Sequence, residues 1–388
     1  MPQTDVSTGA TASTPVLATI PIISSNKRIP ELDGVRGLAI AFVLIFHCLE
    51  VDLPGHKLLY YALLPTHQMW SGVDLFFVLS GFLIGGILLD RRESPSYYST
   101  FYGRRVYRIF PVYYLMIVGL FMGVWLFPKS PLFHGSIPLW TYPLFAQNLT
   151  NNAFTEAPPW LGVSWSLAVE EQFYLLLPLA VKLCSRRTLR WLVVICILGA
   201  PLLRVILSML GAMDEQIHAR LVCRADALAL GVAAAMIVRS ESAMAWVRRH
   251  ATVLYPTMLF LYVSLLGLLK WNSFTYLNAV AYTFFDVMYF LLILLLLLAP
   301  VAPLRLFFNL PILRWLGTIS YCTYLIHTPI QLGLFSLLGL GGNTTITGQA
   351  TLLANLAGLA ITLLIAQISW VTFEKHLIKR AHLRYRYA

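Results

Sequence analysis

The stretch KRIPELDGVRGLAIAFVLIFH, from Lys27 to His47, carries charged side chains into an otherwise apolar run. From Leu38 onward, His47 is the first residue that interrupts the apolar character. Such a run is typical of a membrane-spanning helix, and ionisable side chains inside these helices usually have a function. We therefore expect a helix that crosses a membrane and holds functional groups along its length.

Helical geometry places the charged residues of this stretch on one side. Arg36 and His47 are eleven residues apart, which on an α-helix is about three turns and roughly 16 Å of rise. Asp33 precedes Arg36 by one turn and joins the same side. Because an imidazole is easily kept neutral and basic near pH 7, His47 is a candidate general base. The alternative is a buried histidine bonded to a neighbouring backbone carbonyl.

The composition excludes a soluble protein. The 388 residues are 58% hydrophobic and 12% charged, with a mean hydropathy of +0.72, which soluble domains do not sustain. The net charge of +11 does not indicate nucleic-acid binding, because the basic residues fall between long apolar runs, where the positive-inside rule explains them. The five cysteines show no CxxC spacing, so we expect neither a disulfide framework nor a metal site.

The apolar runs predict an all-α polytopic membrane protein of the cell membrane with about ten transmembrane helices. We expect these spans at about 33–51, 70–89, 108–127, 165–183, 191–210, 222–238, 252–270, 278–300, 315–338 and 350–373. Most of the 28 Lys and Arg residues then share one side, so both termini are predicted to be cytosolic. Residues 1–26 are predicted to be a flexible tail, 27–376 the transmembrane domain and 377–388 a basic cytosolic tail.

Several polar residues are expected at similar depths inside the spans. Because isolated charges in hydrocarbon are costly, these residues should face one another or a wet cavity. The candidates for this polar layer and for the substrate site are Asp33, Asp74, Ser166, Glu171, Tyr174, Asp226 and His327. Ser166, Glu170 and Tyr174 recur every four residues and form one stripe. Glu170 is a candidate to orient His47 or take up its proton, and an interhelical hydrogen bond is the alternative.

A cluster of arginines occurs in YGRRVYRIFP, at the expected cytosolic mouth of the third span. Arg105 and Arg108 are three residues apart on a predicted helix and form a fork suited to phosphate groups. The alternatives are a topology signal or contacts with the head groups of membrane lipids.

Six blocks of sequence, in order across about 28–376, resemble the membrane acyltransferase-3 family. They are LDGVRG with the following His47, GVDLFFVLSGFLI (72–84), FYGRRVYRIFPVYY (101–114), SWSLAVEEQFYLLLP (164–178), RADALALG (224–231) and ISYCTYLIH (319–327). The family contains multi-span acyltransferases that modify surface polysaccharides, other cell-envelope glycans and some macrolides. The resemblance implies a ten-helix core, a cytosolic acyl-CoA donor and an essential histidine, here His47, with Arg36. It also implies that Arg105 and Arg108 serve the donor.

Two features depart from the family pattern. The closing FEKP of the family appears as FEKH at 373–376, and no extracytoplasmic SGNH-type domain follows. A second catalytic domain, if one is needed, is therefore expected from a separate extracytoplasmic transferase partner.

Our hypothesis is an integral membrane O-acyltransferase that moves an acyl group, with acetyl-CoA the expected donor, to a hydroxyl of a glycan, lipid-linked sugar or glycosylated small molecule. His47 would act as general base or transient acyl carrier, with Glu170 as its partner. Arg36, Arg105 and Arg108 would bind the donor phosphates. One alternative is a transporter with the buried His, Asp and Glu residues as a proton relay. Another is a sensor or scaffold whose arginines bind anionic lipid.

Overall fold

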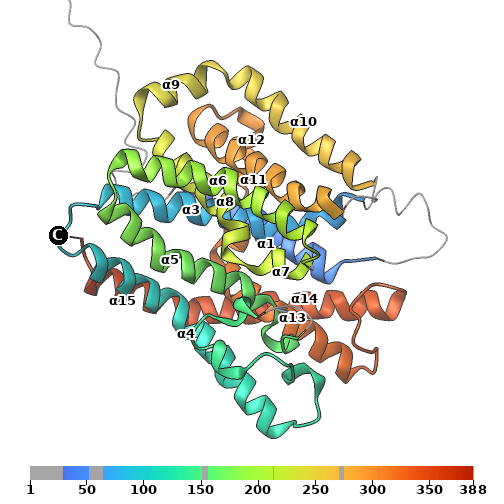
Figure 1. Cartoon of the computed structure of the whole chain (residues 1–388). Coiled ribbons are helices and arrows are strands. Elements are labelled where there is room, and N and C mark those ends of the chain that lie inside the picture. The colour runs from blue at the N-terminus through green and yellow to red at the C-terminus, as the bar shows by residue number, and fades with distance from the viewer. Residues whose placement is uncertain (1–28, 52–63, 151–155, 213, 271–274, 388) are drawn as a thin grey trace, which may run out of the picture.

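A computed structural model describes residues 29–51, 64–150, 156–212, 214–270 and 275–387 of the chain (Figure 1). The regular structure of these residues is helical, apart from one isolated β-bridge between Val51 and Ile346. The predicted all-α class is therefore confirmed. The flexible tail expected at 1–26 lies outside the described residues.

Each of the ten predicted spans corresponds to a long helix. These helices are α1 (Pro30–Cys48), α3 (Gly72–Asp90), α4 (Tyr97–Leu126), α5 (Trp165–Leu183), α6 (Arg186–Met209), α8 (Leu221–Ile237), α10 (Ala251–Lys270), α11 (Thr275–Leu298), α13 (Pro311–Leu337) and α14 (Gln349–Ser369). Shorter helices between them include η1 (Leu64–Ser71), α7 (Asp214–Ala219), α9 (Glu241–Arg249) and α12 (Ala302–Phe308).

Among the described residues, five helical stretches are long and apolar enough to cross a membrane. They are Pro65–Asp90, Tyr97–Leu126, Arg186–Met209, Ala281–Leu298 and Gln349–Arg384. A sixth span results if Ile217–Ile237 and Glu241–Arg249, which are bent by 103°, count as one. The protein is thus a multi-pass membrane protein, whereas a total of ten spans and the side of the termini stay predictions. Helices α1, α5 and α13 are not among the five. These three helices carry polar side chains that line the cavity described below.

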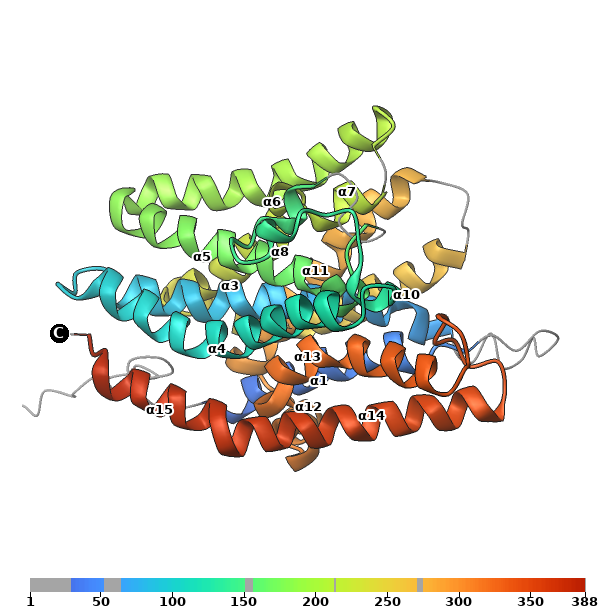
Figure 2. The same cartoon turned by 90° about the horizontal axis from the view of Figure 1, so that it is seen from below.

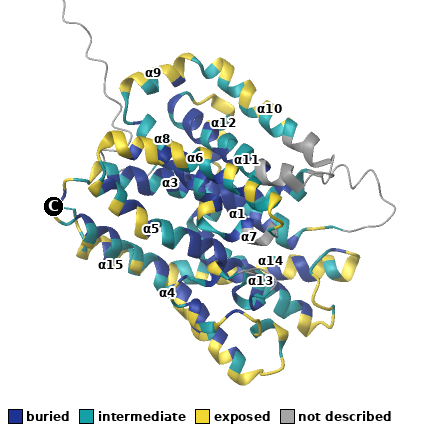
Figure 3. Ribbon diagram, viewed as in Figure 1, coloured by how far each residue is buried: buried dark blue, intermediate teal, exposed yellow. Residues whose placement is uncertain are grey.

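The surface of the bundle is strongly apolar, as a lipid environment requires. Buried residues gather in the middle of the bundle, and α4, α6 and α14 show exposed stretches (Figure 3). Large exposed apolar side chains on these three helices include Leu115, Trp125, Leu198, Leu202, Leu364 and Ile368. Lipid tails are as apolar as these side chains, so exposing the side chains to lipid costs little free energy.

Helices α1 and α13 pack against each other through glycines in the middle of the bundle (Figure 2). A methyl group added at Gly317 would lie 3.0 Å from the backbone nitrogen of Gly37 and closer still to the carbonyl oxygen of Asp33. Helices α3 and α8 meet in the same way at Gly81 and Gly231. Small residues let helix backbones approach closely, which is a common basis of helix association in membranes.

A buried network of ion pairs joins four helices. Arg204 of α6 binds both carboxylate oxygens of Asp226 on α8, at 3.0 and 2.7 Å, and the Thr283 hydroxyl of α11 donates to Asp226 at 2.7 Å. Arg224 of α8 pairs with Asp74 of α3. The four charged side chains are fully buried. Pairing removes most of the cost of burying them, so the network ties α3, α6, α8 and α11 together.

The C-terminal part of the described chain runs along the bundle as one long helical element. A π-helical turn, Trp370–Glu374, joins α14 to α15 (Lys375–Arg384). The backbone then returns to α4, where the Thr100 hydroxyl donates to the Arg386 carbonyl at 3.0 Å and Arg104 Nε donates to the Tyr385 carbonyl at 3.0 Å. The boundary expected near 376 therefore lies within continuous helix.

Candidate functional site

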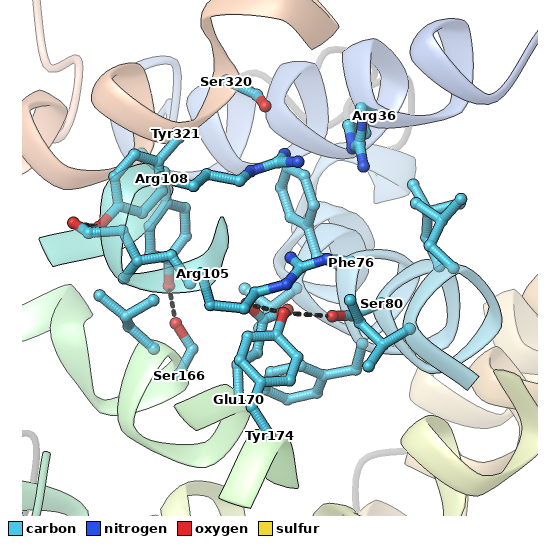
Figure 4. A pocket seen from close by; sticks show the side chains of 18 residues that line it. Arg36, Phe76, Ser80, Arg105, Arg108, Ser166, Glu170, Tyr174, Ser320 and Tyr321 are labelled. Carbon is cyan, nitrogen blue, oxygen red and sulfur yellow. Dashed lines mark hydrogen bonds between the residues drawn. The ribbon is translucent and has the colours of Figure 1, made fainter. Parts of the chain in front are cut away.

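A cavity of about 120 Å³ lies where α1, α3, α4, α5 and α13 meet (Figure 4). Its polar lining comes from all five helices. The polar residues are Arg36, Ser80, Arg105, Arg108, Ser166, Glu170, Tyr174, Ser320, Tyr321 and Tyr324. Apolar side chains such as Phe76 and Leu83 complete the wall. The cavity therefore joins residues that are far apart in the sequence.

Arginines dominate the charge of this cavity. Among the described residues that line it, Arg36, Arg105 and Arg108 are cationic, and Glu170 is the one carboxylate. Guanidinium groups bind phosphate and carboxylate oxygens through paired N–H donors. The cavity is consequently suited to an anionic ligand at the end where the arginines lie.

Aromatic rings and a carboxylate hold two of these arginines in place. Arg105 lies over the ring of Tyr174, with 5.3 Å from the guanidinium carbon to the ring centroid, and over the ring of Phe101 at 5.7 Å. Arg36 forms an ion pair with Asp33, one turn earlier on α1, at 3.5 Å. Stacking on aromatic faces fixes the plane of a guanidinium and so prepares it for a planar anion.

A hydrogen-bonded chain crosses the middle of the cavity. The Tyr174 hydroxyl donates to Glu170 Oε2 at 3.2 Å and shares a 2.6 Å hydrogen bond with the Ser80 hydroxyl. Glu170 also interacts electrostatically with Arg105 and Arg108. Ser166, Glu170 and Tyr174 all reach the cavity wall from α5, in keeping with the predicted stripe.

Tyr324 of α13 lies at another wall of the cavity. Its hydroxyl shares a 2.5 Å hydrogen bond with Ser166 and donates to the Val163 carbonyl at 3.1 Å. One turn further along α13, the ring of His327 lies 5.8 Å from the Tyr324 ring, measured between centroids. Tyr324 therefore contacts the cavity on one side and His327 on the other.

His47 lies beyond the cavity lining, beside His327. The two imidazole centroids are 5.0 Å apart, and His47 Nδ1 donates to the Val43 carbonyl at 2.9 Å. The His47 ring also lies beside that of Phe46, and the Thr344 hydroxyl donates to the His47 carbonyl at 3.5 Å. Glu170, the expected partner of His47, accepts a hydrogen bond from Tyr174 and interacts electrostatically with Arg105 and Arg108.

The residues expected in one polar layer are divided among several places. Ser166, Tyr174 and Glu170 line the cavity, His327 accompanies His47, and Asp33 lies at the Arg36 end. Asp74 and Asp226 belong to the ion-pair network of α3, α6 and α8. Glu171 is next to Glu170, with its Oε1 atom buried and without a hydrogen-bond partner among the described residues.

Sequence reasoning missed several residues of the cavity. Ser80, Ser320, Tyr321 and Tyr324 line it, and none was a candidate. A signal for part of this set was present, because Ser320, Tyr324 and His327 recur at helical spacing along the predicted ninth span. Within the described residues, no group of three His, Cys, Asp or Glu side chains is arranged to hold a metal ion.

Comparison with known families gives one match over most of the chain. Residues 29–371 match the family described as "Acyltransferase domain". No solved structure shows significant similarity to the chain.

Curated relatives are bacterial O-acetyltransferases. The peptidoglycan O-acetyltransferase OatA of Listeria monocytogenes is 27% identical over 79% of this chain and 50% of the relative. The putative peptidoglycan O-acetyltransferase YrhL of Bacillus subtilis is 29% identical over 55% of this chain and 34% of the relative. The O-acetyltransferase OatA of Staphylococcus aureus is 32% identical over 42% of this chain and 26% of the relative. The matched region thus spans half or less of each of these relatives.

Proposed function

Because the chain belongs to the family of acyltransferase domains, we propose that it transfers an acyl group, acetyl in the first instance, from acyl-CoA to a hydroxyl group of a glycan. The names of its relatives, which are O-acetyltransferases of peptidoglycan, support both the acetyl group and the glycan acceptor. The relatives extend well beyond the matched region. A separate extracytoplasmic transferase is a proposed partner.

One observation supports the choice of donor: Arg36, at the cavity, and His47 are far apart along one helix. Arg36 borders the cavity and His47 lies beyond it, and on the uninterrupted helix α1 their eleven-residue separation is roughly 16 Å of rise. Acyl-CoA is a long, thin molecule with phosphates at one end and the reactive thioester at the other. Acetyl phosphate carries both groups on adjacent atoms and cannot occupy both places.

The hydrogen bond of His47 favours its role as general base. A carbonyl oxygen only accepts hydrogen bonds, so the Nδ1 that bonds to Val43 carries the proton, and Nε2 of the neutral ring keeps a lone pair. Nε2 would take the proton of the acceptor hydroxyl while its oxygen bonds to the acyl carbon and the carbon–sulfur bond breaks. The proton then passes to the departing thiolate, which balances the reaction.

The remaining cavity residues would bind and align the donor. Arg36, Arg105 and Arg108 would hold phosphate oxygens. Glu170 interacts electrostatically with Arg105 and Arg108, which favours a role in orienting their guanidinium groups. The partnership of Glu170 with His47 stays a prediction.

The test uses the purified full-length protein in detergent with radiolabelled acetyl-CoA and soluble fragments of peptidoglycan. We expect label in the glycan and release of free thiol. His47→Ala should lower this rate by about 100-fold or more, the usual size of acid–base catalysis, with a melting temperature close to that of the parent. A His47→Ala protein that keeps more than about a tenth of the parental rate would contradict the assignment of the base.

Two controls separate the proposal from its alternatives. Labelled acetyl phosphate at the same concentration should give no transfer if the path requires a long donor. A transporter would instead move intact substrate into proteoliposomes without breaking a thioester. A lipid sensor would bind anionic vesicles and leave acetyl-CoA unchanged. Transport without cleavage of the thioester, or lipid binding without any change in acetyl-CoA, would remove the enzymatic assignment.

A further inference from the structure

The two histidines beside the cavity meet because of the register between α1 and α13. These helices touch at Gly37 and Gly317, and each histidine follows its glycine by ten residues. Helices that run in the same direction rise equally, about 15 Å over ten residues, so His47 and His327 reach the same level. The rings are 5.0 Å apart between centroids and inclined by 68°. The pair is therefore built into the helix packing.

Both rings have the same proton arrangement. His327 Nδ1 donates to the Tyr324 carbonyl at 2.7 Å, as His47 Nδ1 donates to the Val43 carbonyl at 2.9 Å. A neutral imidazole with its proton on Nδ1 presents Nε2 as a hydrogen-bond acceptor. The neighbouring rings of His47 and His327 therefore each present an Nε2 acceptor. A proton placed between these two nitrogens would be covalently bound to one and hydrogen-bonded to the other.

The Nε2 atom of His327 is otherwise unexplained. It is buried and has no hydrogen-bond partner among the described residues, and the whole side chain is inaccessible to solvent. Burying an acceptor without a partner is unfavourable. A histidine that only held the Tyr324 carbonyl would need Nδ1 alone, so a partner for Nε2 is expected at another stage of the reaction.

We propose that His327 is a positioning residue whose Nε2 accepts a hydrogen bond from His47 Nε2–H after His47 has taken the proton of the acceptor hydroxyl. This role rests on the proposed function and adds the residue that orients the protonated His47 ring. Ring centroids at 5.0 Å allow two facing ring nitrogens to come within hydrogen-bond distance. His327 keeps its own proton throughout, and the transferred proton leaves His47 for the thiolate, so the balance of the reaction is unchanged.

Two substitutions separate this role from a structural one. In His327→Gln the longer amide places an oxygen acceptor near the position of Nε2. In His327→Asn the shorter amide replaces only the Nδ1–H donor that holds the Tyr324 carbonyl. His327→Gln thus keeps the acceptor of the imidazole and His327→Asn keeps its donor, so each variant serves as the control for the other.

We expect His327→Gln to keep kcat within about tenfold of the parent and His327→Asn to lose about 100-fold, the scale of acid–base effects. Binding of desacyl-CoA, measured by calorimetry, should be unchanged in both, because the arginines lie on α1 and α4. Equal kcat values, or a more active Asn variant, would overturn the proposal. If the Asn variant does not fold, a 100-fold loss in a folded Gln variant would overturn it equally.

The same assays distinguish this inference from the proposed function. An inactive His47→Ala protein together with a fully active His327→Asn protein would remove the His327 role and leave the acyltransferase assignment intact. A fully active His47→Ala protein would remove His47 as the base and the role of His327 with it, whereas a parent protein that transfers no acyl group would remove the proposed function.

Discussion

The replacement Gly317→Ala tests whether the packing of α1 on α13 sets the position of the histidine pair. The added methyl group would lie 3.0 Å from the Gly37 nitrogen and from the Asp33 carbonyl carbon, and closer to the Asp33 oxygen, whereas ordinary contact begins at 3.4 Å. Because these are backbone atoms, no side-chain rotation relieves the contact. The two helices must separate by at least about 0.4 Å, and by more at the carbonyl oxygen.

A displacement of this size should affect chemistry more than donor binding. A misplacement of about 1 Å can lower an enzymatic rate by roughly 100-fold. We therefore expect Gly317→Ala to lower kcat by about ten- to 100-fold. The dissociation constant of desacyl-CoA should change by a smaller factor, because two of the three donor arginines, Arg105 and Arg108, lie on α4 and only Arg36 lies on α1. Single-turnover transfer of labelled acetyl groups gives the first quantity and calorimetry the second.

Gly333→Ala is the matched control for this experiment. Gly333 lies on the same helix, α13, but a methyl group there would have no neighbour within 4 Å. This variant should equal the parent in kcat and gain slightly in helix stability. A folded Gly317→Ala protein with the kcat of Gly333→Ala would refute the argument that the glycine contact fixes the reactive geometry.

Three further predictions test other parts of the molecule. Arg105→Lys combined with Arg108→Lys keeps the charge but loses the paired N–H groups of the guanidinium. The binding free energy of acyl-CoA, measured by calorimetry, should weaken by about 1.5–3 kcal/mol for each charged hydrogen bond lost. Unchanged affinity would mean that these arginines act as topology signals. Asp226→Asn removes the carboxylate that pairs with Arg204 on α6 and should lower the free energy of unfolding by about 3–5 kcal/mol in chemical denaturation. An unchanged midpoint would refute a structural role for the network. Single cysteines at Arg187 and Gly342 in a cysteine-free background should react with an impermeant reagent only from the cytosolic and only from the outer side, respectively, and labelling of both from one side would invalidate the orientation.

The helices were predictable because their signal is local. Apolar runs of about twenty residues marked each long helix, and the four-residue spacing of Ser166, Glu170 and Tyr174 predicted their common face. The termini of helices were less accurate: α4 begins at Tyr97, about three turns before the expected start, since its amphipathic beginning lacks the apolar character that defined the span.

The partners of the site residues could not be predicted, because they depend on contacts between distant segments. Asp74 and Asp226 were expected in one polar layer whose members face one another or a wet cavity, but each lies against an arginine of a neighbouring helix, which compensates its charge at shorter range. The pairing of His47 with His327 depends on the register of α1 and α13, and this register depends on glycines that have no polar signal of their own. Sequence periodicity shows which residues share a face of one helix, but not which helix that face meets.

The Tyr324 hydroxyl, held by Ser166 and Val163 at the cavity wall, has a consequence for the choice between acyl transfer and hydrolysis. An enzyme that holds an activated ester must transfer it to sugar in the presence of a large excess of water. Tyr324 lines the cavity and its ring neighbours that of His327, so this held side chain is placed to restrict the access of water to the histidines. Wasteful hydrolysis of the donor should then be slow until an acceptor displaces this hydroxyl, and the ratio of productive transfer to idle turnover becomes a property of one phenol group.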